Sequence, residues 1–250
     1  SKDAAVMILT DDNFATIVRA VEYGRALYDN LSKYIRFQMT ALPAFIISYL
    51  GAAFFVILGG LPFLASTVLW INFAIQIPIA LALGFDKPLP GLMDRKPRPL
   101  AQPILSRSQW ARMIFLGLLI SFGTLLLEWY YELTSAAPAQ TMGFAVFSLF
   151  NIAIGLSARS EFQTFFDRDN FTDRRQLTLY GTALLLTFLA TELGFLQRVL
   201  GITSLRAQQW LICAGFAFAL ILVDEVIKFF LRRRHSQPAV ESQVVSQAAP

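Results

Sequence analysis

Six apolar segments, each about long enough to cross a lipid bilayer, constrain this chain more than any other feature of its sequence. A transmembrane helix needs about 20 mostly apolar residues in a row. Only 15% of the residues are charged, against about 25% in an ordinary soluble domain. The sequence therefore predicts an all-α polytopic membrane bundle of six transmembrane helices, with the lipid bilayer as its partner. The predicted spans are Phe37–Leu58, Pro62–Phe85, Met113–Tyr131, Thr141–Ala158, Leu177–Leu196 and Ala207–Phe230.

The distribution of positive charge predicts the orientation of this bundle. Six spans place both ends of the chain on one side of the membrane, and of the 21 Lys and Arg residues only Arg198 and Arg206 fall on the other side. Because Lys and Arg collect in cytoplasmic loops, we expect both termini in the cytoplasm of a multi-pass protein, with the plasma membrane as its location. The basic residues are clustered between apolar segments and not along one polar face, so no nucleic-acid partner is expected.

The segment before the first span predicts the end of a soluble domain. Ala4–Leu9 is a short apolar run, typical of a buried strand, and the polar cluster Thr10–Asn13 after it is typical of a helix cap. From Phe14 to Arg36 apolar residues recur every three or four positions, as in an amphipathic helix. We expect residues 1–36 to be the remnant of an α/β domain and a stalk helix, residues 37–234 the membrane domain and residues 235–250 a disordered tail.

The second span carries polar residues at a depth where hydrocarbon disfavours them. Asn72 and Gln76 are four residues apart, on one face of an α-helix, and Pro78 then removes a backbone hydrogen bond. Pro43 does the same in the first span, and Asn151 lies in the fourth. Such groups either line a transport path or make hydrogen bonds between helices. The residue types alone leave both interpretations open.

The remaining acids are expected to have structural roles. Glu128 and Glu132 end the third span and should be solvated at the membrane interface, whereas Glu192 should be the most deeply embedded acid. Asp224 is expected to pair with arginines of the Pro-rich loop, which runs from residue 86 to residue 112. The single Cys213 should pack as a small apolar side chain.

Four stretches share their order and spacing with a known family. They are Ser1–Phe14, Gly24–Phe37, Leu69–Arg98 and Leu222–Lys228. The third begins Leu-Trp-Ile-Asn and continues through Ala-Leu-Gly-Phe. Together they resemble the carboxy-terminal part of the P-type cation-transporting ATPases, closest to the calcium-pump-like branch. The resemblance implies the end of a phosphorylation domain, the stalk of the fifth membrane helix, the sixth helix with its loop, and the tenth helix.

The same resemblance implies a pump driven by ATP through a phosphorylated aspartate. In the family that aspartate sits in an Asp-Lys-Thr-Gly-Thr motif, which this sequence does not contain. Mg and ATP are therefore expected to bind to amino-terminal domains of the same protein, which would be partners of this chain. We expect no catalytic residue and no ATP or Mg site in the chain itself, and the resemblance leaves open which metal ligands it holds.

The calcium pumps of this family bind their ion with oxygen ligands from the fifth, sixth and eighth helices. By position, Asn72 matches a family Asn, whereas Gln76 replaces an Asp and Asn151 replaces an acid. Leu42 and Phe45 stand in the places of an Asn and a Glu. Hard divalent cations prefer several carboxylate oxygens. The transported cation could thus be calcium-like, or the cargo could be a monovalent or organic cation or a lipid. A non-transporting truncated scaffold is the third alternative.

Overall fold

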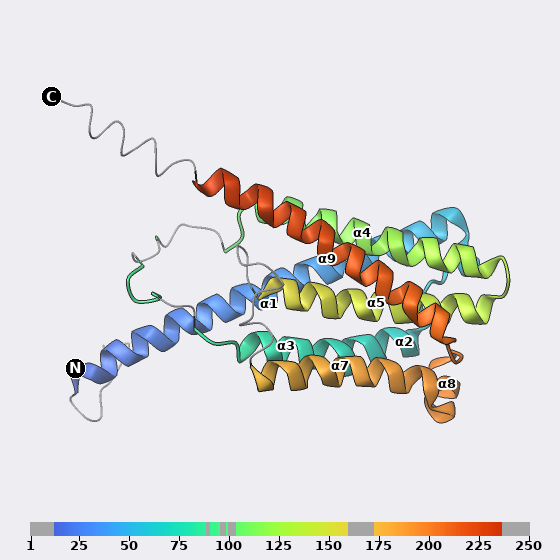
Figure 1. Cartoon of the computed structure of the whole chain (residues 1–250), viewed down its shortest axis with the longest axis horizontal. Coiled ribbons are helices and arrows are strands. Elements are labelled where there is room, and N and C mark those ends of the chain that lie inside the picture. Colours follow the sequence, from blue (N-terminus) through green and yellow to red (C-terminus); the bar gives the residue numbers. More distant parts are fainter. Residues whose placement is uncertain (1–12, 89–90, 96–98, 100–103, 160–172, 237–250) are drawn as a thin grey trace, which may run out of the picture.

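The computed structural model describes residues 13–88, 91–95, 99, 104–159 and 173–236, and every regular element within these ranges is a helix (Figure 1). The predicted all-α fold is confirmed, while the predicted strand Ala4–Leu9 and the tail beyond residue 236 lie outside the described residues. The helices are α1 (Phe14–Phe55), a 3-10 turn (Ile57–Gly60), α2 (Ala65–Trp70), a π-helical turn (Ile71–Gln76), α3 (Ile77–Gly84), α4 (Arg107–Glu132), α5 (Ala136–Ala158), α7 (Arg174–Glu192), α8 (Gly194–Leu200) and α9 (Ala207–Ser236).

Five of the described helical stretches are long and apolar enough to cross a membrane, counting Ala65–Gly84 as one. A sixth is obtained if α7 and α8, which are bent by 87° at Leu193, are taken together. The chain is therefore a multi-pass membrane protein, as predicted. The fifth span differs from the prediction because α7 ends at Glu192, whose side chain is exposed, and not at Leu196. Glu192 thus lies at the bend between α7 and α8 and not inside a continuous helix.

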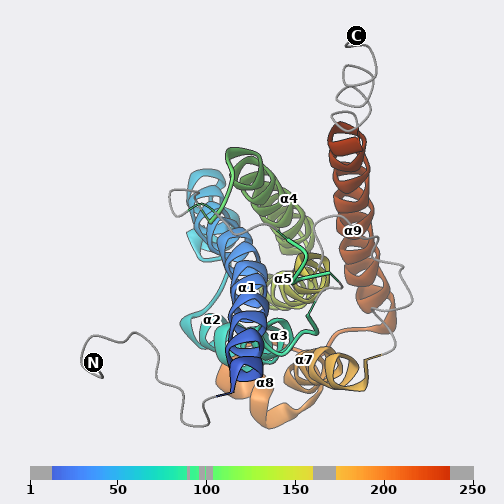
Figure 2. The same cartoon turned by 90° about the vertical axis from the view of Figure 1, so that its left-hand side faces the viewer.

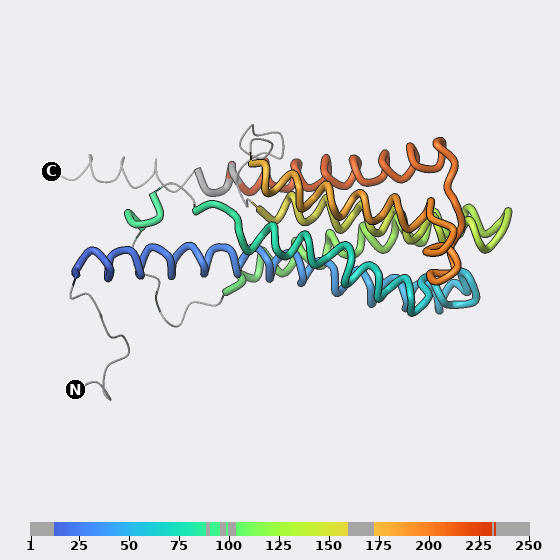
Figure 3. Tube along the Cα trace, turned by 90° about the horizontal axis from the view of Figure 1, so that it is seen from below, coloured from blue at the N-terminus to red at the C-terminus, as the bar shows by residue number. Residues whose placement is uncertain are grey.

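The stalk and the first span form one helix of 42 residues, α1. The side chain of Asn13 caps it by accepting a hydrogen bond from the Ala15 backbone N–H at 2.9 Å. Its first turns extend beyond most of the bundle (Figures 1 and 3). Since no residue from Phe14 to Leu42 breaks the helix, a displacement of its amino-terminal half reaches the membrane segment directly.

Helix α5 forms the centre of the bundle, and α1, α3, α4, α7 and α9 pack around it (Figure 2). Close packing depends on glycine at two places: Gly155 of α5 lies against Ile79 and Tyr180, and Gly117 of α4 lies against the α1 backbone at Thr40. The end of the bundle that carries Lys33, the α3 carboxyl terminus and the start of α7 is called the basic end below. The other end, with the Ile57–Gly60 turn and α8, is called the opposite end.

A buried ion network ties four helices together at the basic end. The Asp86 carboxylate, just after α3, lies 2.8 Å from Lys33 Nζ of α1 and 2.9 Å from Arg159 Nη2 after α5. Lys33 and Asp86 are only 3% and 8% exposed. Asn30 of α1 donates to the Asp86 carbonyl at 2.8 Å, and Gln176 of α7 donates to the Ala82 carbonyl at 2.6 Å. The second span is thereby fixed to the stalk.

A second network joins α4, α5 and α9 at the same end. Arg112 donates to the Asp224 carboxylate from Nε at 3.0 Å and from Nη2 at 2.5 Å. Ser157 donates to the other Asp224 oxygen, and Lys228 lies 3.4 Å from it. The predicted pairing of Asp224 with an arginine is confirmed, but Arg112 belongs to α4, which begins at Arg107, and not to the loop.

The described part of the Pro-rich loop braces the stalk. Arg25 of α1 donates to the backbone carbonyls of Leu92, Met93 and Arg95 at 2.9, 3.3 and 3.0 Å. Arg95 in turn lies 3.0 Å from the Asp29 carboxylate. The described loop residues before α4 form turns but no helix or strand, whereas residues 107–112, which the sequence places in the loop, belong to α4.

Removal of the Asp86 carboxylate should destabilise the bundle. Asp86→Ala leaves the buried Lys33 ammonium without the counter-charge that lies 2.8 Å away, and loss of one partner of a buried ion pair costs about 3–5 kcal/mol. The matched control is Asp29→Ala, whose exposed pair with Arg95 contributes about 0–1 kcal/mol. Unfolding of the complete protein in detergent should show a much lower midpoint for Asp86→Ala than for Asp29→Ala. Equal midpoints would contradict a stabilising role for this network.

Candidate transport path in the second span

The second span is not a regular α-helix. Its central residues, Ile71–Gln76, form a π-helical turn between α2 and α3. Pro78 follows two residues later and has no N–H to donate to the Ala74 carbonyl, so the α-helical ladder cannot continue through this point. π-helical turns are rare and are frequent at functional sites. The turn contains Asn72 and Gln76, two of the predicted path residues.

Gln76 and Asn151 meet in the buried centre of the bundle. The side-chain amide of Gln76 donates to Asn151 Oδ1 at 3.0 Å, and Asn151 Nδ2 donates to the Phe147 carbonyl one turn earlier on α5 at 2.8 Å. Gln76 is 5% exposed and Asn151 is 1% exposed. The pair therefore links the irregular turn directly to the central helix α5.

The other predicted path residues do not join this pair. Asn72 is half-buried, and its Nδ2 donates to the Val68 carbonyl of its own helix at 2.9 Å. The shared face expected for Asn72 and Gln76 assumed an α-helical repeat, which the π-helical turn does not have. Pro43 lies at the interface of α1 and α4, where it contacts Gly117.

Aromatic side chains occupy the space beside the amide pair. Phe45 of α1 packs on Phe147 of α5 and on Phe63, with ring centroids 4.3 and 5.7 Å apart, and Phe63 lies 5.0 Å from Phe147. Leu42, the other α1 residue named by the resemblance, is 46% exposed on the bundle surface. At these two positions α1 thus presents no oxygen ligand to the pair.

The described side chains around the pair supply polar atoms but no counter-charge. No group of three or more His, Cys, Asp or Glu side chains that could hold a metal ion occurs within the described ranges. The buried carboxylates of Asp86 and Asp224 are already paired at the basic end. Two amides can offer carbonyl oxygens to a cation, but this arrangement leaves the charge of a divalent ion uncompensated.

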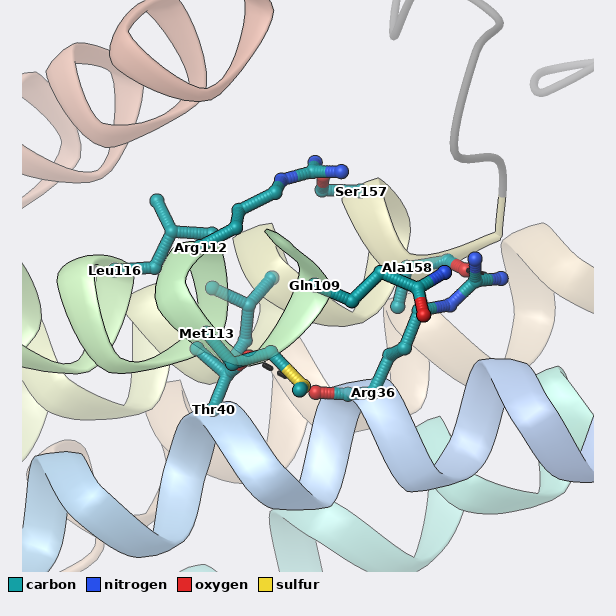
Figure 4. Close-up of a pocket in the computed structure, with 9 residues that line it drawn as sticks. Arg36, Thr40, Gln109, Arg112, Met113, Leu116, Ser157 and Ala158 are labelled. Atoms are coloured by element: carbon teal, nitrogen blue, oxygen red, sulfur yellow. Dashed lines mark hydrogen bonds between the residues drawn. The ribbon is translucent and has the colours of Figure 1, made fainter. Parts of the chain in front are cut away.

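A small cavity lies beside the path and not on it. It has a volume of about 40 Å³, lies between α1, α4 and α5 near the basic end, and is lined by Arg36, Thr40, Arg112 and Ser157 among others (Figure 4). Figure 4 shows the two guanidinium groups at its rim, and the Arg112 guanidinium is held by Asp224. The cavity has room for a few water molecules at most. None of the predicted path residues lines it.

Glu128 is the residue that the sequence interpretation placed wrongly. It was expected at the solvated interface with Glu132, but the structure buries it completely, at 0% exposure, between α4 and α5. The sequence feature that indicates this burial is a set of small and polar residues on one face of α4, at the spacing of Gly117, Ser121, Thr124 and Glu128. All four are buried, so this face points into the bundle.

Cys213 is buried and free, as predicted for a packed apolar side chain.

Comparison with known proteins gives a consistent family. The family model described as "Cation transporting ATPase, C-terminus" matches residues 60–230. The chain is 31% identical over 230 residues to calcium-transporting ATPase 1 of Lactococcus lactis and 30% identical over 251 residues to calcium-transporting ATPase type 2C member 2 of Mus musculus. These alignments cover 91% and 97% of this chain but only 26% of each relative. The chain thus spans about a quarter of their length.

The match covers five of the six predicted spans, including the π-helical turn and the central helix α5. It includes two of the four stretches that carry the resemblance, Leu69–Arg98 and Leu222–Lys228. This chain therefore belongs to the cation-transporting ATPases and corresponds to their carboxy-terminal membrane part.

Proposed function

We propose that this chain is the membrane half of an ATP-driven cation pump and that Asn72, Gln76 and Asn151 lie on its transport path. Because the chain spans about a quarter of its relatives, ATP hydrolysis, the Mg ion and the phosphorylated aspartate are assigned to amino-terminal domains of the same protein. Two relatives are named calcium-transporting ATPases, which favours a calcium-like cation as the cargo.

The observation that carries this proposal is the buried Gln76–Asn151 pair beside a π-helical turn. Two amide side chains at this depth are costly in hydrocarbon unless they bond to each other or to a ligand. A widened helical turn also leaves its backbone carbonyls less firmly bonded than a regular α-helix does. The position therefore combines polar atoms with a backbone that can change conformation.

A second candidate is a pump for a monovalent or organic cation. It is favoured by the bonds of the amide pair, which within the described residues run to each other and to a backbone carbonyl, and by the lack of any cluster of three or more potential metal-binding side chains there. Amide and backbone carbonyl oxygens can replace part of the hydration shell of a monovalent ion without full charge neutralisation. Measurement of ATPase activity against calcium, sodium and potassium concentration separates the two candidates.

The stalk supplies the coupling in this proposal. Asn30 and Lys33 of α1 hold Asp86 at the carboxyl end of α3. The amino-terminal end of α3 directly follows the π-helical turn. Movement of the phosphorylation domain would thus reach the path through a short, rigid segment. We further propose that the protein lies in the plasma membrane and that its basic end faces the cytoplasm, because positively charged residues collect at that end.

Loss of the path amides should abolish ion-stimulated ATP hydrolysis. Gln76→Leu or Asn72→Ala in the complete protein removes a polar group from the path, and metal-site substitutions of this kind cost about tenfold or more in affinity or activity. Thr178→Ala on the exposed face of α7 is the control and should retain wild-type activity. Full ion stimulation in both path variants would exclude these side chains as ligands.

A double substitution distinguishes a transport role of the amide pair from a purely structural one. Gln76→Leu alone leaves Asn151 Oδ1 without its donor and should cost about 1–3 kcal/mol of stability. Gln76→Leu with Asn151→Leu removes both partners and should recover much of that stability. If the pair serves transport, the double variant regains its thermal midpoint but not its ion-stimulated ATPase. Recovery of both would assign the pair a structural role only.

The proposed orientation predicts which loops react with a membrane-impermeant thiol reagent. Cys213 is buried and should give little background. In intact cells, Thr134→Cys, exposed between α4 and α5 at the opposite end, should be labelled from outside, whereas Ser108→Cys at the start of α4 should react only after permeabilisation. The reverse pattern would place the basic end outside the cell.

A further inference from the structure

Glu128 is a fully buried carboxyl group for which the described residues provide no hydrogen-bond partner. Its exposure is 0%, and neither Oε1 nor Oε2 has a donor or acceptor. The carboxyl group rests on Gly143 of α5, and a Cβ atom at that position would lie 1.9 Å from Oε1. Only glycine leaves room for the acid here. A side chain packed this tightly is an integral part of the interface between α4 and α5.

The surroundings of Glu128 offer no positive charge. From α1 the facing titratable group is Tyr49, whose hydroxyl already donates to the Phe63 carbonyl at 2.9 Å. From its own helix the facing group is Glu132, a second acid, and α5 presents Gly143. An ionised Glu128 would be a buried charge without compensation, which is far costlier than a buried neutral acid. In this conformation the group therefore carries a proton.

A metal ion does not fit this position. Hard cations need six or more oxygen ligands or retained waters, whereas the carboxyl group here is in contact with the α5 backbone at Gly143. Among the described residues, no third acid, His or Cys joins Glu128 and Glu132. A proton is the one cation that needs no additional ligand and no cavity.

Glu132 lies one helical turn nearer to the opposite end and is only half-buried. Its Oε2 accepts a hydrogen bond from the Leu58 backbone N–H at 3.0 Å, a bond to which an ionised carboxylate is well suited. Residues four apart on an α-helix share one face. Glu132 thus lies between Glu128 and the opposite end of the bundle.

We propose that Glu128 is a proton-binding site of this bundle, separate from the amide path, and that it exchanges its proton with the solution at the opposite end through Glu132. The two carboxyl groups are not hydrogen-bonded to each other in this conformation, so exchange first requires a side-chain rotation that brings them into hydrogen-bond contact. The Glu128 O–H bond then breaks, and its proton is taken up by the Glu132 carboxylate, which passes it to water. Glu128 is left as a carboxylate, and the reverse transfer restores the acid. The site requires neither the cargo nor the orientation proposed above.

Infrared absorption of the complete protein in lipid membranes tests the protonated state. At neutral pH the C=O stretch of a protonated carboxylic acid should be present in the wild type and absent from Glu128→Gln. The control Glu192→Gln, which changes an exposed acid at the same end, should retain it. Should Glu128→Gln fail to fold, Glu128→Asp keeps an acid and should show the same type of band at a shifted frequency. A wild-type spectrum that loses only carboxylate bands on substitution would overturn the proposal.

Hydrogen–deuterium exchange tests the route. Transfer of the membranes into D2O should shift the Glu128 band, and the shift should be at least about tenfold slower in Glu132→Gln than in the wild type or Glu192→Gln, because a positioned proton acceptor is lost. Equal rates in all three would exclude Glu132 as the route. Neither measurement depends on ion-stimulated ATPase, so each can fail independently of the pump proposed above.

Discussion

The Asp86 carboxylate is the point on which the arrangement of the helices depends. Lys33 from α1 and Arg159 after α5 share this one acid, and the buried Lys33 ammonium would be an uncompensated charge without it. Asp86 follows shortly after α3, so the carboxyl-terminal end of the second span cannot move away from the stalk without separating these charges. Asn30 strengthens the link because it also donates to the Gly84 carbonyl at the end of α3. The stalk and the second span therefore move together at the basic end.

The middle of the second span has the opposite property. Between the fixed end at Asp86 and the regular helix α2 lies the π-helical turn, where Pro78 prevents a continuous α-helical ladder. The only side-chain hydrogen bond that an interhelical partner makes to this turn, within the described part of the chain, is that between Gln76 and Asn151. A segment held rigidly at one end and irregular in its middle changes conformation where it is irregular. Motion of α1 would thus be absorbed at the amide pair.

The features of this fold that the sequence predicts are mainly those that depend on the residues of one helix. The length of the apolar segments predicts the spans, because a helix must be long enough to cross the hydrocarbon layer. The absence of a helix-breaking residue before Leu42 predicts that the stalk and the first span are continuous. Of the contacts between helices, the sequence predicts the pairing of Asp224 with an arginine but not those made by Glu128 and Lys33. The burial of Glu128 depends on Gly143 opposite to it, and the pairing of Lys33 with Asp86 joins residues 53 positions apart. The bend after Glu192 occurs without a proline, so the residue types did not mark it.

Acidic side chains divide the bundle into three levels with different electrostatics. At the basic end Asp86 and Asp224 are neutralised by cations, so they contribute no free negative charge to a passing ion. At the amide pair the hydrogen bonds among the described residues are to an amide and to the backbone carbonyl of Phe147, whose ring packs on Phe45 and Phe63. Toward the opposite end Glu128 is buried without a cation. A divalent ion at the amide pair would therefore need carboxylates from beyond the described residues, whereas the proton proposed on Glu128 needs no further ligand. The two proposals thus involve different helices: the cation path would use the second span and α5, and the proton site would use α4.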